Sequence, residues 1–405
     1  MTDAPAIEAP AAHPHRRRGL VALCLTQIVM WGVLYYSLPV ATAEITADTG
    51  WPDSLVMGTL SAAMLVQAAA AIPAGHAIAR FGPRTVMTGA TIVAAGALLL
   101  SASAAHPAAF VGGWLIAGAA MAGTLYQAAF TAITEWFAPR AIGALTVVTL
   151  AGGLASTVFA PVVSALLDAT DWRTAYLALP AIIAAVALPL HATLPARPRR
   201  AHARARGERA PAAETARIAR SPLFLALAAA ISLSTLGVSA AHLNIIAFLQ
   251  EHGFDHAVGA LALGLVGLGQ VLGRLGYPRL SAAVPVLPRA ILSIAASAIA
   301  LALLVALPIS VALVMTFALL LGAARGLTTL IHASGLSELW DARHYAVLAG
   351  HLSLPVTAAG AIAPWAGAFL AETTGGYGPA FVILTAVTAL SAVALLFALR
   401  GSRHA

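Results

Sequence analysis

Charged residues are scarce in this chain: only 9% of its 405 residues are charged, against about 25% in an average soluble domain. Lysine is absent, so all 22 basic residues are arginine, and 60% of the chain is hydrophobic. A soluble protein of this length could not cover its surface with so few polar groups. The composition therefore excludes an ordinary soluble fold and predicts that most of the surface faces lipid. The net charge of +7 does not indicate a nucleic-acid partner, because the arginines lie between apolar runs.

Cysteine is also nearly absent, since Cys24 is the only one and no intrachain disulfide can form. The Cys and His residues do not recur at the spacing of metal ligands, so we expect no metal site and no cofactor. The nucleotide-binding pattern G-x-x-x-x-G-K-[ST] is missing as well. A membrane enzyme or a receptor with a folded soluble domain therefore has no support, and we predict that the chain is not an enzyme.

Long apolar runs are what the chain has in abundance. A helix needs about 20 apolar residues to cross the hydrocarbon core of a bilayer. Twelve runs meet this requirement, and the predicted fold is an all-α integral membrane protein with spans at about 19–42, 54–75, 85–105, 108–133, 142–166, 174–194, 222–249, 257–277, 289–308, 311–333, 345–370 and 379–399.

The arginines orient these spans. With the N-terminus inside, cytoplasmic loops and tails hold 20 of the 22 arginines. We therefore expect a multi-pass protein of the plasma membrane of a bacterium, with both termini cytoplasmic. The first run could instead be a cleaved signal peptide that ends at Ala41-Thr42-Ala43. Its length, and residues such as Gln27 and Trp31 within it, favour a retained helix.

The two halves of the chain resemble each other at an offset of about 200 residues. Ala160-Pro161 in one half matches Ala363-Pro364 in the other, and further glycine positions match in the same order. Between the halves lies a segment with eight arginines, which we interpret as a flexible cytoplasmic linker. The predicted organisation is a tail (1–18), a six-helix half (19–194), the linker (195–221), a second half (222–399) and a short tail (400–405).

Two six-helix halves joined by a basic linker resemble the major facilitator superfamily over almost the whole chain. The loop after the second span adds Gly75, Arg80, Gly82 and Arg84, which look like the conformational loop motif of that family. Ala79 stands where the family usually has Asp. The segment 322–330 is similar to the monocarboxylate and oxalate/formate-like branch, and this similarity implies transport of an organic anion.

The resemblance also implies that the first, fourth, seventh and tenth spans line a central cavity. These spans carry polar residues at helical spacing, whereas the third, ninth and twelfth are almost entirely apolar. The candidate substrate-binding residues are Arg325, Gln27, Trp31, Tyr35, Thr124, Gln127, Ser239, His242, Thr328 and Thr329. For Trp31 and Tyr35, core packing is the alternative role.

Arg325 is the most informative of these residues, because it lies in the middle of a span where a charge is costly. No Asp or Glu lies in the interior of any predicted span. The missing counter-ion could be an anionic substrate, or Arg325 could be a structural residue bound to carbonyl and hydroxyl groups. His242 and His332 could carry a proton, or each could be a hydrogen-bonding residue of the cavity wall.

Charged residues also follow the fourth and tenth spans. Glu135 with Arg140, and Glu338 with Arg343, occupy equivalent positions in the two halves. They could form ion pairs that close the cytoplasmic gate between the halves, although such surface pairs often contribute little.

The sequence thus predicts a secondary active transporter that moves a small solute, such as a monocarboxylate, by alternating access, with proton coupling or exchange. The alternative is an exporter of a neutral, toxic or drug-like compound, in which Arg325 is structural. The expected partners are the substrate and the lipid bilayer, and nothing requires more than a monomer.

Overall fold

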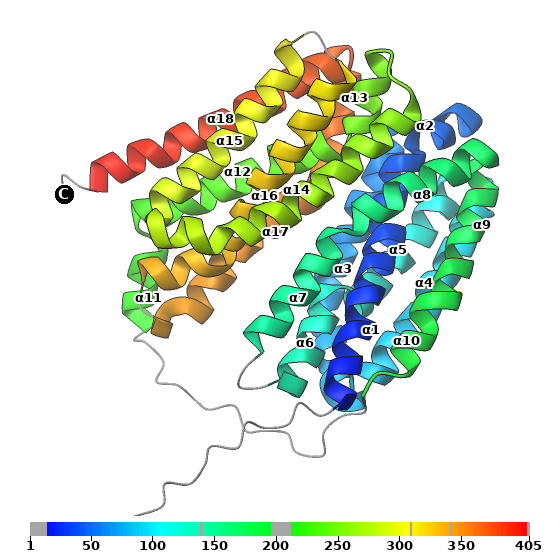
Figure 1. The fold of residues 1–405 in the computed structure, drawn as a ribbon, viewed down its shortest axis with the longest axis horizontal. Helices are drawn as coiled ribbons and strands as arrows, with labels where there is room; N and C mark the ends of the chain where they lie inside the picture. The colour runs from blue at the N-terminus through cyan, green and yellow to red at the C-terminus, as the bar shows by residue number, and fades with distance from the viewer. Residues whose placement is uncertain (1–13, 138–140, 196–211, 308–309, 341, 403–405) are drawn as a thin grey trace, which may run out of the picture.

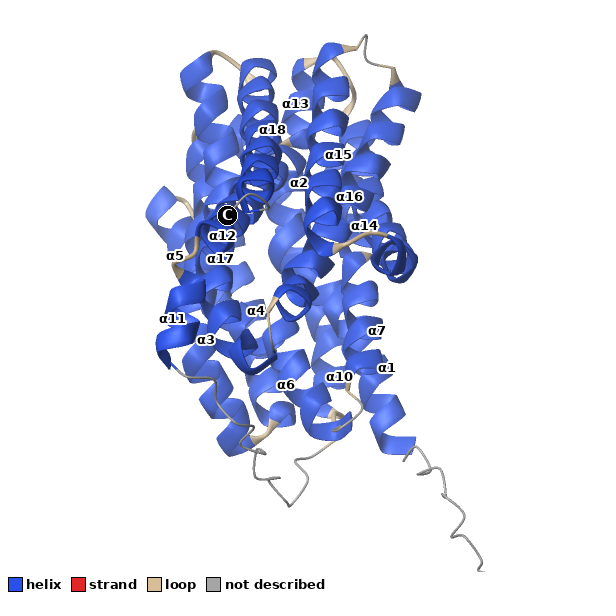
Figure 2. Cartoon of the chain, turned by 90° about the vertical axis from the view of Figure 1, so that its left-hand side faces the viewer, coloured by secondary structure: helices blue, strands red, loops and turns tan. Residues whose placement is uncertain are grey.

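The computed structural model describes residues 14–137, 141–195, 212–307, 310–340 and 342–402. All regular elements in this part of the chain are helices, as Figure 2 shows. Twelve of the helical stretches found there are long and apolar enough to cross a membrane, and this confirms the predicted number of spans. Figure 1 shows them in two groups, one running from blue to green and one from green to red.

The first group contains α1 (Pro14–Trp31), the π-helical turn η1 (Gly32–Tyr36), α2 (Ser37–Thr49), α3 (Asp53–Phe81), α4 (Pro83–Ala102), α5 (Pro107–Thr124), α6 (Tyr126–Phe137), α7 (Ile142–Gly153), α8 (Ala155–Ala169), α9 (Trp172–Ile182), the π-helical turn η2 (Ile183–Ala187) and α10 (Leu188–Ala192). We call it the N-half.

The second group, the C-half, follows the short helix α11 (Ala212–Ala219). It contains α12 (Pro222–Leu243), α13 (Ile245–Glu251), α14 (His256–Ala283), α15 (Val286–Ala306), α16 (Val311–Leu339), α17 (Ala342–Thr374) and α18 (Tyr377–Ser402). We call the membrane side that carries the segment between α10 and α12 the linker side, and the opposite side the distal side.

Several helices are longer than the apolar runs that predict them. The run at 311–333, for example, is the 29-residue helix α16. At about 1.5 Å per residue such a helix is about 43 Å long, whereas the hydrocarbon core is about 30 Å thick. The helix ends must therefore project into the interfacial region, or the helix must tilt, so hydropathy alone placed these ends too early.

Some spans are interrupted near the centre of the molecule. The fourth span breaks at Leu125, whose extended backbone separates α5 from α6. The carbonyl oxygen of Thr124 at this break accepts a hydrogen bond from Gln27 Nε2 at 2.8 Å. The seventh span changes direction at Asn244, whose Nδ2 donates to the carbonyl oxygens of Ala240 at 2.8 Å and Pro364 at 3.3 Å. The Gln27 amide thus satisfies the carbonyl that the break at Leu125 leaves free.

The predicted linker is not irregular throughout, because residues 212–219 form α11. The Thr215 hydroxyl shares a 2.7 Å hydrogen bond with Nδ1 of the buried His344 in α17. Ile218 packs on the apolar cluster at the linker side of the C-half. These contacts place this part of the segment against the C-half.

The residues of the predicted loop motif lie at the end of α3 and the start of α4, and their surroundings differ. Gly82 ends α3 with φ of 84°, a conformation that favours glycine. Arg80 lies over the Phe81 ring at 5.1 Å, and both Arg80 and Arg84 are exposed. A Cβ on Gly75 would meet nothing within 4 Å, so no neighbouring helix packs against this glycine in this conformation.

The halves meet along α3 with α17 and along α8 with α14. α2 and α13 come together on the distal side, at the top of Figure 1. Hydrogen bonds link the two halves on this side. The Ser54 amide donates to Glu372 at 2.8 Å, and the Tyr377 hydroxyl donates to Asp53 at 2.8 Å. His256 of the C-half bonds the Val40 carbonyl at 2.8 Å. The distal side is therefore held closed by polar contacts between the halves.

Candidate substrate-binding site between the two halves

Arg325 and His242 form a direct pair at the centre of the C-half. Arg325 Nη1 lies 2.8 Å from His242 Nε2, and His242 Nδ1 lies 3.3 Å from the Val238 carbonyl oxygen. A carbonyl can only accept, so we assign the ring hydrogen to Nδ1. Nε2 then carries a lone pair that accepts from the guanidinium. His242 is therefore neutral in this arrangement, and Arg325 keeps its full positive charge.

Aromatic residues of the N-half face this pair. Trp31 contacts Tyr35 and Tyr126 with ring centroids 5.2 and 5.0 Å apart, and Tyr126 stacks on Phe130 at 5.3 Å. The Tyr35 hydroxyl lies beside the Arg325 guanidinium. Tyr36, whose ring contacts Tyr35 at 4.9 Å, approaches the His242 ring at 6.5 Å. We call Trp31, Tyr35, Tyr36, Tyr126 and Phe130 the aromatic wall.

A cavity of about 210 Å³ opens beside Arg325 within the C-half. Its walls come from α12, α15, α16 and α17 and consist of Ile231, Ser234, Thr235, Val238, Ser239, Ser297, Arg325, Thr328, Thr329, His332 and Val356. Four of the predicted binding residues, Arg325, Ser239, Thr328 and Thr329, thus line one cavity. His332, a predicted proton carrier, lies in the same wall, with its Nε2 3.4 Å from the Ser353 hydroxyl.

Three predicted residues lie elsewhere. Gln27 and Thr124 are fully buried and joined by the bond at the α5–α6 break, so each has a structural partner inside the N-half. Gln127 is exposed on α6. None of the three lines the cavity beside Arg325, and their role in binding stays a prediction.

A second arginine within a span is Arg274 of α14, which the predicted topology counts among the 20 arginines of the cytoplasmic loops and tails. Its Nη1 donates to the Thr149 carbonyl oxygen of α7 at 2.6 Å, and the Tyr126 hydroxyl donates to the same oxygen at 3.2 Å. Arg274 therefore links the C-half to the N-half beside the aromatic wall. The signal was available, because residue 274 lies inside the predicted span 257–277.

No carboxylate among the described residues forms an ion pair with Arg325 or Arg274. Within the described ranges, the ion pairs are Arg173 with Asp48, Arg289 with Glu338 and His344 with Glu214, all near the ends of spans. An uncompensated cation inside a membrane protein is costly and marks a ligand or ion pathway. Of the two arginines, Arg325 is the one that borders the cavity.

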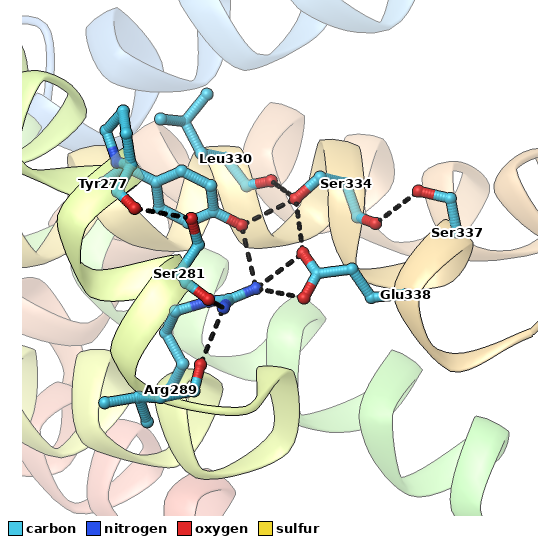
Figure 3. Close-up of polar contacts among 9 residues, drawn as sticks. Tyr277, Ser281, Arg289, Leu330, Ser334, Ser337 and Glu338 are labelled. Carbon is cyan, nitrogen blue, oxygen red and sulfur yellow. Dashed lines mark hydrogen bonds and ion pairs between the residues drawn. The ribbon is translucent and has the colours of Figure 1, made fainter.

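The residues expected to form gating ion pairs behave differently. Glu338 pairs with the fully buried Arg289 of the same half, at 2.6 and 2.7 Å, and does not bridge the halves (Figure 3). Arg289 Nη2 also donates to the Tyr277 hydroxyl oxygen at 3.1 Å. Arg140 and the side chain of Arg343 lie outside the described residues, and Glu135 is half-buried at the end of α6.

Arg289 lies in the first turn of α15, and its guanidinium also donates to the Val284 carbonyl oxygen at 2.8 Å. In this conformation Glu338 therefore has a partner within the C-half, and its role in an ion pair between the halves stays a prediction.

Twelve membrane-spanning helices in two halves, with polar and cationic residues gathered between them, define a membrane transporter. The model of the Major Facilitator Superfamily matches residues 23–312, which is most of the chain. The chain therefore belongs to the major facilitator superfamily.

Similar curated proteins include monocarboxylate transporter 13 of Bos taurus and of Rattus norvegicus, each 27% identical over 65% of this chain. The match spans 59% of the length of either relative. Among solved structures, the nucleoside transporter NupG superimposes with a TM-score of 0.78 at 14% identity, covering 95% of this chain and 99% of its own. A bacterial homologue of the lysosomal transporter Spinster gives 0.71 at 16% identity, with 96% and 97% covered. These structures establish the shared fold.

Proposed function

We propose that this chain is a secondary active transporter that binds a small organic anion, such as a monocarboxylate, at Arg325. The observation that carries this proposal is the position of the Arg325 guanidinium, which borders a cavity and has the neutral His242 as its partner. A substrate carboxylate would supply the missing negative charge. The curated relatives are named monocarboxylate transporters, which also favours an anionic substrate.

The chemistry of the guanidinium fits a carboxylate. Its planar set of five N–H donors can bind two carboxylate oxygens at once. The Tyr35 hydroxyl beside Arg325 offers a further donor, and the apolar faces of the aromatic wall exclude water from the pair. An ion pair shielded from water is stronger than one at a surface.

His242 supports coupling to protons. Protonation at Nε2 would remove the acceptor for Arg325 and place a second positive charge 2.8 Å from the guanidinium. A carboxylate bound beside both groups would offset this repulsion. A proton and an anion would therefore bind together more readily than either alone, as a symporter requires. Anion exchange is the other mode of coupling that this site allows.

Alternating access requires the distal contacts to break. The bonds from Ser54 to Glu372 and from Tyr377 to Asp53 join the halves directly. A substrate that binds between the aromatic wall and Arg325 touches both halves, so its binding energy could favour one arrangement of the halves over the other.

The test is ligand-dependent stability of purified protein, compared between wild type and Arg325→Gln. A carboxylate at about 100 times its dissociation constant should stabilise wild type by about 2.7 kcal/mol. Arg325→Gln should lose this effect, whereas Arg279→Gln, which removes an exposed arginine at the end of α14, should keep it. Stabilisation of wild type and Arg325→Gln by the same neutral compound would instead support the exporter.

A second variant separates binding from coupling. His242→Gln retains a neutral acceptor for Arg325 but has no titrating ring. In proteoliposomes we expect it to bind the carboxylate and to exchange it, while an imposed pH gradient no longer drives uptake. Undiminished pH-driven uptake by His242→Gln would exclude His242 as the proton carrier.

A further inference from the structure

The cavity beside Arg325 has a composition that the anion site alone does not require. Six of its lining residues carry hydroxyl groups: Ser234, Thr235, Ser239, Ser297, Thr328 and Thr329. We propose that this cavity is a subsite for the tail of the substrate, and that the substrate is a hydroxylated carboxylate whose O–H groups donate to these residues. The inference rests on the proposed anion site at Arg325.

Most of these hydroxyl groups have already used their hydrogen. Thr235 donates to the Ile231 carbonyl at 2.7 Å and Thr329 to the Arg325 carbonyl at 2.9 Å. Ser297 donates to the Ser293 carbonyl at 3.1 Å. A hydroxyl has a single hydrogen, so these three oxygens offer only lone pairs to a ligand.

The fourth hydroxyl, Thr328, is satisfied in the same way. It lies 3.1 Å from the Ala324 carbonyl and 2.7 Å from the Ser293 hydroxyl, which also reaches Ala324 at 2.9 Å. The hydroxyl hydrogens of Thr328 and Ser293 are therefore both used in bonds among these two hydroxyls and the Ala324 carbonyl. Four of the six hydroxyl oxygens therefore form a row of acceptors, with one cation, Arg325, at the end of the cavity.

The direction of the cavity follows from the helices. Ser239 and Arg325 lie at its distal end, while Ile231 and His332 lie toward the linker side, because α12 and α16 run in opposite directions. Seven residues separate Arg325 from His332, or about 10 Å of helix. A carboxylate at Arg325 thus leaves room for a chain of several atoms that extends toward the linker side.

An entirely apolar tail would fit this cavity poorly. It would displace water from the lone pairs of the hydroxyls without giving them a donor, and buried polar groups without partners are costly. A tail with hydroxyl groups supplies the donors, while its C–H groups can pack on Ile231, Val238 and Val356. A cation is disfavoured by Arg325. The acceptor row and the single cation together select a polyhydroxylated acid.

The experiment measures binding of gluconate, hexanoate and acetate to purified protein in lipid nanodiscs by calorimetry. Gluconate and hexanoate have the same number of carbon atoms and the same carboxylate, and differ in their hydroxyl groups. We expect gluconate to bind at least tenfold more tightly than hexanoate. Thr329→Val should weaken gluconate about three- to tenfold, the effect of one hydrogen bond, and leave acetate unchanged.

Thr316→Val is the matched control. Thr316 lies on the same helix and donates to its own i−4 carbonyl at 2.8 Å, but it is exposed outside the cavity. It should leave gluconate binding unchanged. Thr235→Val, on α12, is the second test variant should Thr329→Val not fold, and the same selective loss is expected.

The inference would be overturned if wild type bound hexanoate as tightly as gluconate, or more tightly. It would also be overturned if Thr316→Val and Thr329→Val lost the same affinity for gluconate. If acetate still binds and loses affinity in Arg325→Gln, the anion site survives and only the tail subsite fails. If none of the three acids binds wild type, the proposed anion site itself fails.

Discussion

Helices α14 and α16 pack so closely that adding one methyl group to a glycine at their contact should push them apart. Gly269 and Gly273 on α14 interlock with Gly322 and Gly326 on α16, and this four-residue spacing is known from close helix pairs in membranes. A Cβ built on Gly322 would lie 2.1 Å from the Val266 carbonyl oxygen. Gly322→Ala is therefore the perturbation with the clearest steric consequence.

The magnitude follows from the distance that the methyl group must gain. An ordinary carbon–oxygen contact between helices is about 3.3–3.6 Å, so the two backbones must separate by roughly 1 Å. Overpacking of this kind costs about 1–3 kcal/mol. Alanine recovers up to about 1 kcal/mol as the better helix former, which leaves a net destabilisation of about 1–2 kcal/mol.

Ligand binding should suffer as well. Arg325 follows Gly322 by one helical turn, so a shift of α16 changes its 2.8 Å contact with His242. The assay is unfolding of purified protein in mixed detergent and SDS micelles, followed by tryptophan fluorescence, with carboxylate binding measured on the same samples.

Gly276→Ala is the control for this prediction. Gly276 lies on α14, and a Cβ there would meet nothing within 4 Å, so the variant should be as stable as wild type or slightly more stable. The steric reasoning is refuted if Gly322→Ala is as stable as Gly276→Ala.

Two further predictions concern charged groups outside the cavity. Glu338→Gln leaves the fully buried Arg289 with a neutral partner, and we expect a loss of about 1–3 kcal/mol in the same unfolding assay; no change would show that the pair is dispensable. Asp171 caps α9, and its hydrogen bonds from Thr174 lower the pKa of the carboxyl group below its usual 3.8. The stability that wild type holds over Asp171→Ala should therefore be complete at neutral pH and be lost only as the pH falls below 3.8, through the lowered pKa of the folded carboxyl group; the readout is the difference in melting temperature between pH 7 and a pH below 3.8. A constant difference over this range would contradict the capping argument.

The sequence alone determined the class of the molecule and its number of spans. Hydropathy is a local property of a segment, so twelve apolar runs could be counted without any knowledge of how they pack. The importance of Arg325 was visible for the same reason, because a charge inside an apolar run is costly wherever the helix lies. Arg274 was accessible to the same argument and was missed because it was assigned to a loop.

Only the tertiary structure decided which side chains meet. It shows that the neutral His242 contacts Arg325, that the aromatic wall of the N-half faces this pair, and that Glu338 pairs with Arg289 within the C-half. These contacts depend on how each helix is rotated about its axis and where it breaks, as α5 does at Leu125. Rotation and crossing are set by close packing between segments far apart in the chain, such as the glycines of α14 and α16, and no single segment contains that information.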